Sequence, residues 1–310
     1  MSPGRGAIIG IGELLWDLLP DGPRLGGAPF NVAANAHRLG YRASIVTAVG
    51  RDDLGSQARA IVKDVGVDDD WIQETPDVPT GTARVALDAG GNPTFELVRP
   101  AAFDRLSLDD QGVAAIAAAA PAAFVFGTLA QQSRSVRAAT EALAAACPAA
   151  LRVYDVNLRE GSWDVETVEA MLRLASIVKV NDAEATILGE IFGLRGRPLA
   201  AFMSAMLGRT GCRGVCVTKG PDGAELLIDG VAVRGRAPTI EVVDAVGAGD
   251  AFTAGLIHGV LTGQPADAAL RGAIALGSLV ASRAGGAPDW TAAELAQLKA
   301  ATPAAIPDSA

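Results

Sequence analysis

The segment DAVGAGDAF (Asp244–Phe252) places small residues directly before a carboxylate, that of Asp250. The apolar residues that follow recur every four positions, which predicts one buried face of a helix that begins near Gly249 or Asp250. That repeat consists of Phe252, Leu256 and Val260. The first N–H groups of a helix have no partner within it, and together with the helix dipole they attract anions. Small residues would let a phosphoryl group come close to this backbone.

Asp250 would then lie beside a phosphate bound at the helix end. A carboxylate next to an anion is unfavourable unless it has a task, and phosphoryl transfer needs a group that accepts the proton of the attacking hydroxyl. The same residue could instead only cap the helix, and the local pattern leaves both interpretations open. The segment therefore predicts an anion site with a candidate general base.

Alternating strands and helices must position this site. Short β-rich runs are separated by helical patterns along most of the chain. We expect strands at 7–11, 44–49, 123–126, 152–155, 177–180 and 214–218, and helices at 29–39, 54–64, 250–261, 265–281 and 291–300. This alternation predicts an α/β fold, a doubly wound, mainly parallel sheet flanked by helices, whose ligands bind beyond the C-terminal strand ends.

Two hairpins accompany this pattern. Residues 82–87 and 94–98 have hairpin spacing with polar residues interleaved, so we assign them to a small β-sheet beside the main one. Residues 224–228 and 231–235 form a second hairpin around Asp229-Gly230. We expect a single domain over residues 1–303 and a loose tail over 304–310.

The composition excludes several classes of protein. Half of the 310 residues are apolar and 20% are charged, which is enough apolar material for a large core and excludes a disordered chain. The net charge of −9, without a cluster of Lys or Arg, argues against nucleic acid and anionic membranes as partners. Residues 112–130 carry no charge, but Pro121 divides them into a helix and a strand, so we expect no membrane span.

Cysteine and histidine usage indicates a reduced protein without a zinc centre. The three cysteines form no CxxC motif, and the two histidines form no HExxH motif. The N-terminus lacks the basic-then-apolar pattern of a secretory signal. We therefore expect a cytoplasmic location.

Other nucleotide-binding motifs are missing from the sequence. Gly10-Ile11-Gly12 opens like a dinucleotide-binding fingerprint, but Leu15 occupies the position of its third glycine. No Gly-Lys pair occurs, which excludes a Walker A loop, and no G-x-S-x-G occurs, which excludes the usual nucleophile elbow. A phosphate must therefore be held by a different cradle.

Two segments together resemble the signatures of one family. DAVGAGDAF is similar to the C-terminal signature of the ribokinase/PfkB carbohydrate kinases, and Gly12–Gly40 resembles their N-terminal signature, in particular that of the bacterial fructokinase branch. Further segments match in order and spacing, so the resemblance extends from about Ile8 to Ala287. It implies a ribokinase-like fold in which a small β-sheet, contributed by about 13–28 and 81–100, forms a lid over the sugar.

The resemblance also implies roles for individual residues. Asp250 matches the catalytic base, and the N–H groups of Gly247, Ala248 and Gly249 match the anion hole. Arg159, in the segment DVNLR, is a clamp for the ATP phosphates or the transferred group. The implied sugar contacts are Asp17, Gly27, Asn31, Phe95, Arg99, Gly127 and Thr128. The implied nucleotide contacts are Asn181, Thr218, Lys219, Gly220, Gly223 and Gly249.

Two cations are implied in the same way. Glu184, the last residue of an NxxE motif, would act on Mg²⁺ through water, since this hard cation keeps several waters in protein sites. Asp244 and the carbonyl of Val246 would contribute to a K⁺ site that many members possess. Ala245 stands where the family usually has Thr, and this departure leaves K⁺ dependence open.

Local alternatives stay open for several of these residues. Asp17 could be a solvated turn residue, Asn31 a helix cap and Arg99 an exposed edge charge. Asn181 and Glu184 would also suit an ordinary helix N-terminus, because acidic residues are favourable there. The nucleotide segment TKGPDG (residues 218–223) could be a simple turn.

The most specific function that the resemblance implies is an ATP-dependent fructokinase, which makes fructose 6-phosphate and forms a homodimer through the lid. Alternatives are a kinase for another sugar or nucleoside, such as ribose, 2-keto-3-deoxygluconate or adenosine, and a non-catalytic sugar-binding regulator on the same fold. A nicotinamide-dependent dehydrogenase is disfavoured by Leu15. Gln132 stands where the fructokinase branch has Arg, which leaves the identity of the sugar open.

Overall fold

The structure, a computed structural model, describes residues 5–19, 22–87 and 93–307; of these, the side chains of residues 5, 85–87, 93–95 and 307 are outside the description. Its centre is a 10-stranded sheet with the order β14-β13-β12-β11-β10-β9-β8-β1-β4-β5. The parallel strands are β1 (Arg5–Ile11), β4 (Tyr41–Gly50), β5 (Ile72–Thr75), β8 (Pro121–Phe126), β9 (Leu151–Asp155), β10 (Ile177–Asn181) and β11 (Gly214–Thr218). The antiparallel edge consists of β12 (Ala224–Ile228), β13 (Val231–Gly235) and β14 (Ile306–Pro307).

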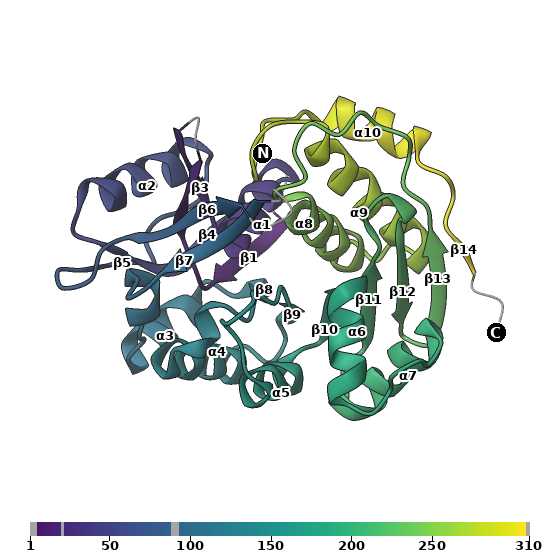
Figure 1. The fold of residues 1–310 in the computed structure, drawn as a ribbon, viewed down its shortest axis with the longest axis horizontal. Coiled ribbons are helices and arrows are strands. Elements are labelled where there is room, and N and C mark those ends of the chain that lie inside the picture. The colour runs from purple at the N-terminus through teal and green to yellow at the C-terminus, as the bar shows by residue number, and fades with distance from the viewer. Residues whose placement is uncertain (1–4, 20–21, 88–92, 308–310) are drawn as a thin grey trace.

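Helices cover both faces of this sheet (Figure 1). One face carries α1 (Ala28–Arg38), α8 (Ala248–Leu261), α9 (Ala266–Ala281) and α10 (Ala292–Ala301). The other carries α3 (Asp110–Ala118), α4 (Arg134–Ala146), α5 (Val165–Leu174), α6 (Asp182–Ile191) and α7 (Leu199–Thr210). Each face buries its own apolar cluster against the near-continuous apolar runs of the parallel strands, as a sheet covered on both sides requires.

A second, four-stranded sheet lies at one end of the molecule, at the left of Figure 1. Its order is β3 (Gly22–Gly26), β2 (Leu15–Leu19), β6 (Gly81–Leu87) and β7 (Pro93–Val98). The pair β2–β6 is parallel and the other two pairs are antiparallel, so the sheet is mixed. Helix α2 (Asp53–Asp64) and its neighbours pack on a third apolar cluster between the two sheets. We call this second sheet the lid sheet.

The order of the strands creates a switch point beside β1. The chain runs from β1 outward to β4 and β5, and then returns to β8 on the opposite side of β1. Crossovers therefore diverge between β1 and β8, and a crevice opens at the C-terminal ends of those strands. Gly12 and Gly127 follow β1 and β8 at this crevice.

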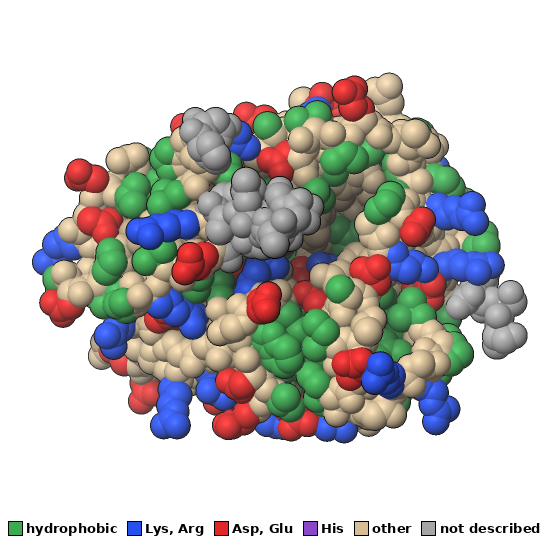
Figure 2. Space-filling view, viewed as in Figure 1, with side chains coloured by type: hydrophobic (Ala, Val, Ile, Leu, Met, Phe, Trp, Pro, Cys, Tyr) green, Lys and Arg blue, Asp and Glu red, His purple; other side chains and the backbone are tan. Residues whose placement is uncertain are grey.

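The predicted α/β fold class is confirmed, and so are its principal elements. Pro121 opens β8, where its missing N–H does not interrupt the ladder, and the preceding alanines form α3. Within the described residues, no helix is both long enough and apolar enough to cross a membrane. On the face in Figure 2, Lys and Arg side chains are scattered among Asp and Glu rather than gathered in a patch.

One boundary differs from the expected one. The predicted loose tail includes Ile306 and Pro307, which pair with Arg234 and Val233 as an edge strand of the large sheet. The prediction was wrong there because Ala305 is buried in the apolar cluster under α9 and draws the chain along β13. The sequence of the tail is short and rich in alanine, and it contains no strand pattern that would predict its pairing with β13.

Candidate active site

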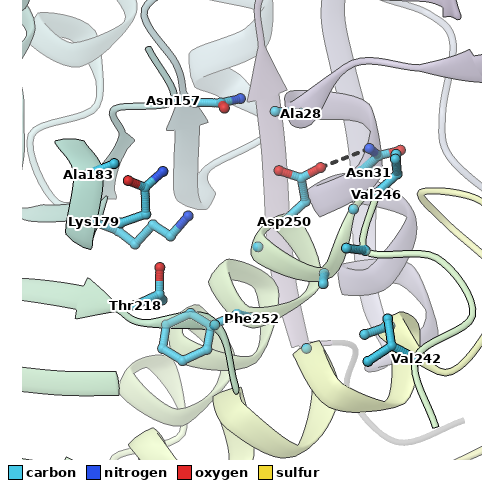
Figure 3. A pocket seen from close by; sticks show the side chains of 18 of the residues that line it. Ala28, Asn31, Asn157, Lys179, Ala183, Thr218, Val242, Val246, Asp250 and Phe252 are labelled. Atoms are coloured by element: carbon cyan, nitrogen blue, oxygen red, sulfur yellow. Dashed lines mark hydrogen bonds between the residues drawn. The ribbon is translucent and has the colours of Figure 1, made fainter. Parts of the chain in front are cut away.

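A cavity of about 1310 Å³ extends from the lid sheet along the C-terminal ends of the parallel strands. It is lined by Asp17 and Leu97 at the lid, by the first turn of α8, and by Thr218 at the far edge. Pockets for one small ligand usually measure about 300–1,000 Å³, so there is room for two ligands side by side. Figure 3 shows Asp250 and Asn31 on one wall, and Asn157, Lys179 and Thr218 on the opposite wall.

The N-terminus of α8 faces this cavity without a side-chain cap. Gly247 occupies the N-cap position with φ of 76° and has no side chain that could accept a hydrogen bond from the first turn. A Cβ atom at Gly247 would lie 2.1 Å from the carbonyl oxygen of Gly286, so both the conformation and the space require glycine. The helix begins at Ala248, slightly before the predicted start. Its backbone N–H groups and its dipole are thus available to an anion.

Asp250 does not cap this helix, which resolves the alternative left open by the sequence. It lies within the first turn, and its Oδ2 accepts a 2.8 Å hydrogen bond from Asn31 Nδ2 (Figure 3). Asn31 belongs to α1, whose N-terminus follows Gly27. This hydrogen bond therefore joins the two signature segments, which are more than 200 residues apart in sequence.

Burial raises the pKa of Asp250 to about 6, and the negative charge of Asp155 adds to the effect. The hydrogen bond from Asn31 and the positive charges of Lys179 and Arg159 act in the opposite direction. A carboxylate with this pKa is ionised at neutral pH and yet is a stronger proton acceptor than an ordinary aspartate. That combination suits general-base chemistry.

Beneath Asp250 lies a buried ion pair between neighbouring strands. Lys179 of β10 is the ladder partner of Asp155 of β9, and its Nζ lies 3.0 Å from Asp155 Oδ1. Thr253 of α8 donates a 2.8 Å hydrogen bond to the other oxygen of Asp155. A Cβ atom built on Gly249 would lie 3.2 Å from Lys179 Nζ, so the ammonium group lies beside the open backbone of α8. It adds positive charge to the predicted anion hole.

The lid side of the cavity contains further carboxyl groups, among them two with a raised pKa. Burial raises the pKa of Asp17 to about 6, against the opposing charge of Arg159. Glu13, 3% exposed, lines the cavity two residues after β1, and its Oε2 has no hydrogen-bond partner in the described part of the chain. Burial raises the pKa of Glu13 to about 7. Gly27, with φ of 117°, packs against the Glu13 carbonyl, which a Cβ atom would approach to 2.4 Å.

Comparison with known proteins identifies the family. A model described as "pfkB family carbohydrate kinase" matches residues 23–293. The fructokinase of Klebsiella pneumoniae is 32% identical over 272 residues (83% of this chain, 85% of the relative), and fructokinase-1 of Zea mays is 31% identical over 291 residues (84% and 85%). The aminoimidazole riboside kinase of Salmonella typhimurium is 30% identical over 261 residues (80% and 78%).

The chain belongs to the PfkB carbohydrate kinase family. It is thus a sugar kinase, a phosphotransferase with an alcohol acceptor. Two solved structures share the fold: a Xylella fastidiosa fructokinase with bound ATP (TM-score 0.83, 24% identity, covering 95% of this chain and 98% of that one), and a putative ribokinase II of E. coli in complex with ATP and Mg²⁺ (TM-score 0.81, 23%, 94% and 98%).

Most of the site residues that the PfkB resemblance implied line the one cavity. They are Asp17, Gly27, Asn31, Arg159, Asn181, Thr218, Gly220, Gly223, Val246, Gly247, Ala248, Gly249 and Asp250. The sequence places them in widely separated segments, and the C-terminal strand ends bring them together. Phe95 belongs to β7, but its side chain lies outside the described residues.

The remaining predicted contacts support the wall rather than form it. Thr128 is fully buried and its hydroxyl bonds to Tyr154 and to the Val156 carbonyl, while Gly127 next to it is also absent from the cavity lining. Arg99 pairs with Asp104 at 3.2 Å and donates to the Leu129 carbonyl. The contacts of Arg99 attach the end of β7 to the segments that contain Asp104 and Leu129, outside the lid sheet.

The predicted nucleotide contact Lys219 has a partner within the protein. Its Nζ lies 2.6 Å from Glu225 Oε1, and the residue is absent from the cavity lining. Its neighbours Thr218, Gly220 and Gly223 do line the cavity. The charge of Lys219 thus holds the loop to β12, and its contact with the nucleotide stays a prediction.

Glu184 has a structural task that its motif did not reveal by itself. It forms a capping box with Asn181, and its two oxygens accept hydrogen bonds from the backbone N–H groups of Asn181 and Leu158. The alternative of an ordinary helix N-terminus thus holds as well. A carboxylate has about four acceptor sites, so two remain for a water of hydrated Mg²⁺. Glu184 is only 3% exposed and is absent from the cavity lining, whereas the exposed Asp182 lines the cavity. These oxygen donors are of the kind that Mg²⁺ takes, and the water-mediated contact of Glu184 stays a prediction.

Asp244 fits its expected cation less well. Its Oδ1 accepts a 3.0 Å hydrogen bond from Val246 N, and its Oδ2 accepts one of 3.0 Å from Gly285 N. The guanidinium group of Arg24, from the lid sheet, lies 3.4 Å from the same Oδ2. The carboxylate thus already holds a fixed cation, and the expectation of K⁺ at Asp244 does not match this arrangement.

Sequence reasoning missed Glu13, Lys179 and Arg24. Signals for the first two existed: Glu13 lies two residues after a buried strand, and Lys179 is one of only four lysines and interrupts the apolar run IVKVN. A charged side chain inside a buried strand needs a partner of opposite charge, so its presence indicates a buried ion pair or a functional site. Arg24 carried no such signal, because its partner lies 220 residues away.

Proposed function

We propose that this protein transfers the γ-phosphoryl group of ATP to a hydroxyl group of D-fructose, forming fructose 6-phosphate. The observation that carries the proposal is Asp250, held by Asn31 at the uncapped N-terminus of α8 in a cavity large enough for sugar and nucleotide. Relatives that are named fructokinases at 31% and 32% identity support fructose as the sugar.

Residues at the two ends of the cavity would hold the two substrates. Asp17, Gly27 and Asn31 bind the sugar beneath the lid sheet. There the carboxylate accepts hydrogen bonds from sugar hydroxyl groups, and the amide can both donate and accept them. Asn181, Thr218, Gly220 and Gly223 line the opposite end, which receives ATP. Glu184 would hold Mg²⁺ through water, and the bound cation would neutralise phosphate charge.

The chemistry is a direct in-line transfer. Asn31 donates to Oδ2 of Asp250, and Oδ1 is left to accept the proton of the attacking sugar hydroxyl. The sugar oxygen forms a bond to the γ-phosphorus as the bond to the β,γ-bridging oxygen breaks and ADP leaves. The N–H groups of Gly247, Ala248 and Gly249, with the charges of Lys179 and Arg159, stabilise the equatorial oxygens.

A sugar panel tests the substrate. ADP release is measured with fructose, ribose, 2-keto-3-deoxygluconate, adenosine and aminoimidazole riboside, and we expect the largest kcat/KM for fructose. The last compound is included because a 30% identical relative is an aminoimidazole riboside kinase. A larger kcat/KM for any other acceptor would replace fructose as the substrate.

A non-catalytic regulator is the second candidate from a different class. Sugar-dependent stabilisation against heating without any ADP release would favour it over the kinase. The proposal also includes a cytoplasmic homodimer paired through the lid sheet, on family resemblance alone. Light scattering of the purified protein measures its mass and contradicts this part if it finds a monomer.

A further inference from the structure

The lid sheet meets the loop before α8 at a narrow seam. The seam contains a cavity of about 20 Å³. Its walls are formed by residues of the lid sheet and by loop residues next to the large sheet. The lid residues are Asp17, Leu19, Arg24 and Leu25, and the loop residues are Asp244, Val246, Gly285 and Gly286. That volume admits a single water-sized particle. The seam therefore joins the sugar end of the active site to its phosphate end.

Asp244 is the hub of this seam. Through Oδ1 it holds the backbone N–H of Val246, directly before the anion-hole residues, and through Oδ2 it holds the N–H of Gly285. The next residue, Gly286, packs against both Gly247 and Asn31. A Cβ atom on Gly247 would lie 2.1 Å from the carbonyl oxygen of Gly286, and a Cβ atom on Gly286 would lie 2.7 Å from Asn31 Nδ2. The carboxylate of Asp244 thus fixes the backbone that shapes the anion hole and that supports Asn31.

The seam also concentrates negative charge. Asp17 is the ladder partner of Arg24 in the β2–β3 pair, and the charge of Asp244 helps to raise the pKa of Asp17. Two carboxylates this near each other repel unless a cation lies between them. Arg24 provides one from the strand opposite Asp17, with its guanidinium group 3.4 Å from Asp244 Oδ2. A guanidinium group in the wall of the small cavity also opposes entry of a second cation.

We propose that Arg24 is a positioning residue that supplies, from the lid sheet, the positive charge that a monovalent cation would otherwise supply at Asp244. Two consequences follow. The enzyme needs no K⁺, and the anion-hole loop is fully fixed only when β3 is seated against it. Binding of the sugar under the lid would then favour completion of the phosphate site. The inference rests on the proposed phosphoryl transfer at this same site.

The first test measures sugar-dependent ADP release by the wild-type protein and by Arg24→Ala in chlorides of K⁺, Na⁺ and tetramethylammonium at equal ionic strength. The wild type should give the same rate in all three salts. Arg24→Ala should lose on the order of ten- to a hundredfold in kcat, the cost of a misplaced catalytic group, with a smaller change in KM for ATP. Dilute guanidinium or K⁺ should restore part of this kcat, and Arg24→Lys should retain more activity than Arg24→Ala.

The second test uses stability and needs no turnover. The midpoint of thermal unfolding should be the same for the wild type in K⁺ and in tetramethylammonium, and it should rise in K⁺ for Arg24→Ala. Arg213→Ala is the matched control, because it removes an exposed ion pair with Asp229 at the β12–β13 hairpin, away from the cavity. This control should show neither the loss of kcat nor the response to K⁺.

Three results would each overturn the inference: activation of the wild type by K⁺, an unchanged kcat in Arg24→Ala, or a loss of kcat that neither guanidinium nor K⁺ restores. If the wild type phosphorylates no sugar at all, the proposed function fails instead. The unfolding experiment still tests the role of Arg24 in that case. The proposed role is contradicted if K⁺ raises the unfolding midpoint of the wild type, or if K⁺ does not raise that of Arg24→Ala.

Discussion

Asp250 combines the catalytic task that we propose for it with a cost to the fold. Its carboxylate is buried beside Asp155 and is compensated only in part by Asn31 and Lys179. Replacing it by asparagine keeps the size of the side chain and removes the proton acceptor. We expect Asp250→Asn to bind ATP and sugar but to lose about 10²–10⁴ in kcat, the usual range for a general base.

The measurement is steady-state ADP release together with titration of ATP binding. Asp267→Asn is the matched control, because Asp267 is also an acidic residue in the first turn of a helix, α9, but is exposed and outside the cavity. Near wild-type turnover in Asp250→Asn would show that another group accepts the proton.

The raised pKa of Asp250 also predicts how activity and stability depend on pH. Because the base must be ionised, kcat/KM should fall below pH 6, about tenfold per pH unit. In the unfolded chain the pKa of this group is near its ordinary value of 3.8, so between that pH and about pH 6 the folded state binds more protons. Its contribution to folding stability is therefore greatest at low pH and falls as the pH rises through this window.

Asp250→Asn removes that dependence. The difference in unfolding free energy between the variant and the wild type should grow in favour of the variant between pH 4 and pH 7, by up to ~3 kcal/mol for a shift of about two pKa units. Denaturant unfolding at several pH values measures it. A difference that stays constant with pH would mean that Asp250 titrates normally.

At the scale of elements, α8 is arranged as an open anion site, and glycine at its N-cap makes this possible. At Gly247 the positive φ and the carbonyl of Gly286 both exclude a side chain. We expect Gly247→Ala to displace the loop and to lower kcat by on the order of a hundredfold, since small misplacements of reacting groups are costly. Turnover and thermal unfolding of the purified variant are the measurements.

Gly263→Ala is the control for this prediction. Gly263 has a positive φ of 66° at the turn after α8, but a Cβ there would meet nothing within 4 Å. It carries the backbone strain, about 1–3 kcal/mol, without the steric conflict, so it should lose stability and keep kcat. Equal kcat in the two variants would show that the Gly247 backbone is not part of the phosphate site.

At the scale of the whole molecule, the site exists only where two sheets meet. Asp17 comes from the lid sheet, whereas Asp250 and Asn31 come from helices on one face of the large sheet. Two ion pairs tie the lid sheet to the rest of the molecule: Arg99, directly after β7, with Asp104, and Arg24 of β3 with Asp244 at the seam. We expect this lid to exclude water when it closes over the substrates, which would limit hydrolysis of ATP.

Closure should be visible in amide hydrogen exchange. With the sugar and a non-hydrolysable ATP analogue bound, exchange should slow most in β2, β3 and β6, because ligand binding stabilises the elements that open most easily. The ladder of β8, β9 and β10 serves as the internal reference. Protection that is confined to that reference, with no change in the lid sheet, would contradict closure over the substrate.

The sequence by itself determined the fold class, most strand and helix positions and the two signature segments, because these depend on local patterns. Apolar runs set the buried strands, small residues set the approach of a phosphate, and Asp250 stands out within a few residues of context. The docking of Ile306 and Pro307 escaped this reasoning because nothing local encodes it.

Only the tertiary structure decided which charges meet. It pairs Lys179 with Asp155 across neighbouring strands and places Arg24 of the lid against Asp244, 220 residues later in the chain. It also buries Glu13 at the cavity, with one oxygen, Oε2, that has no hydrogen-bond partner among the described residues. The physical reason is that the effect of a charge depends on its distance from other charges and on its burial. Both quantities are set by how the two sheets pack, and neither is contained in the pattern of a single segment.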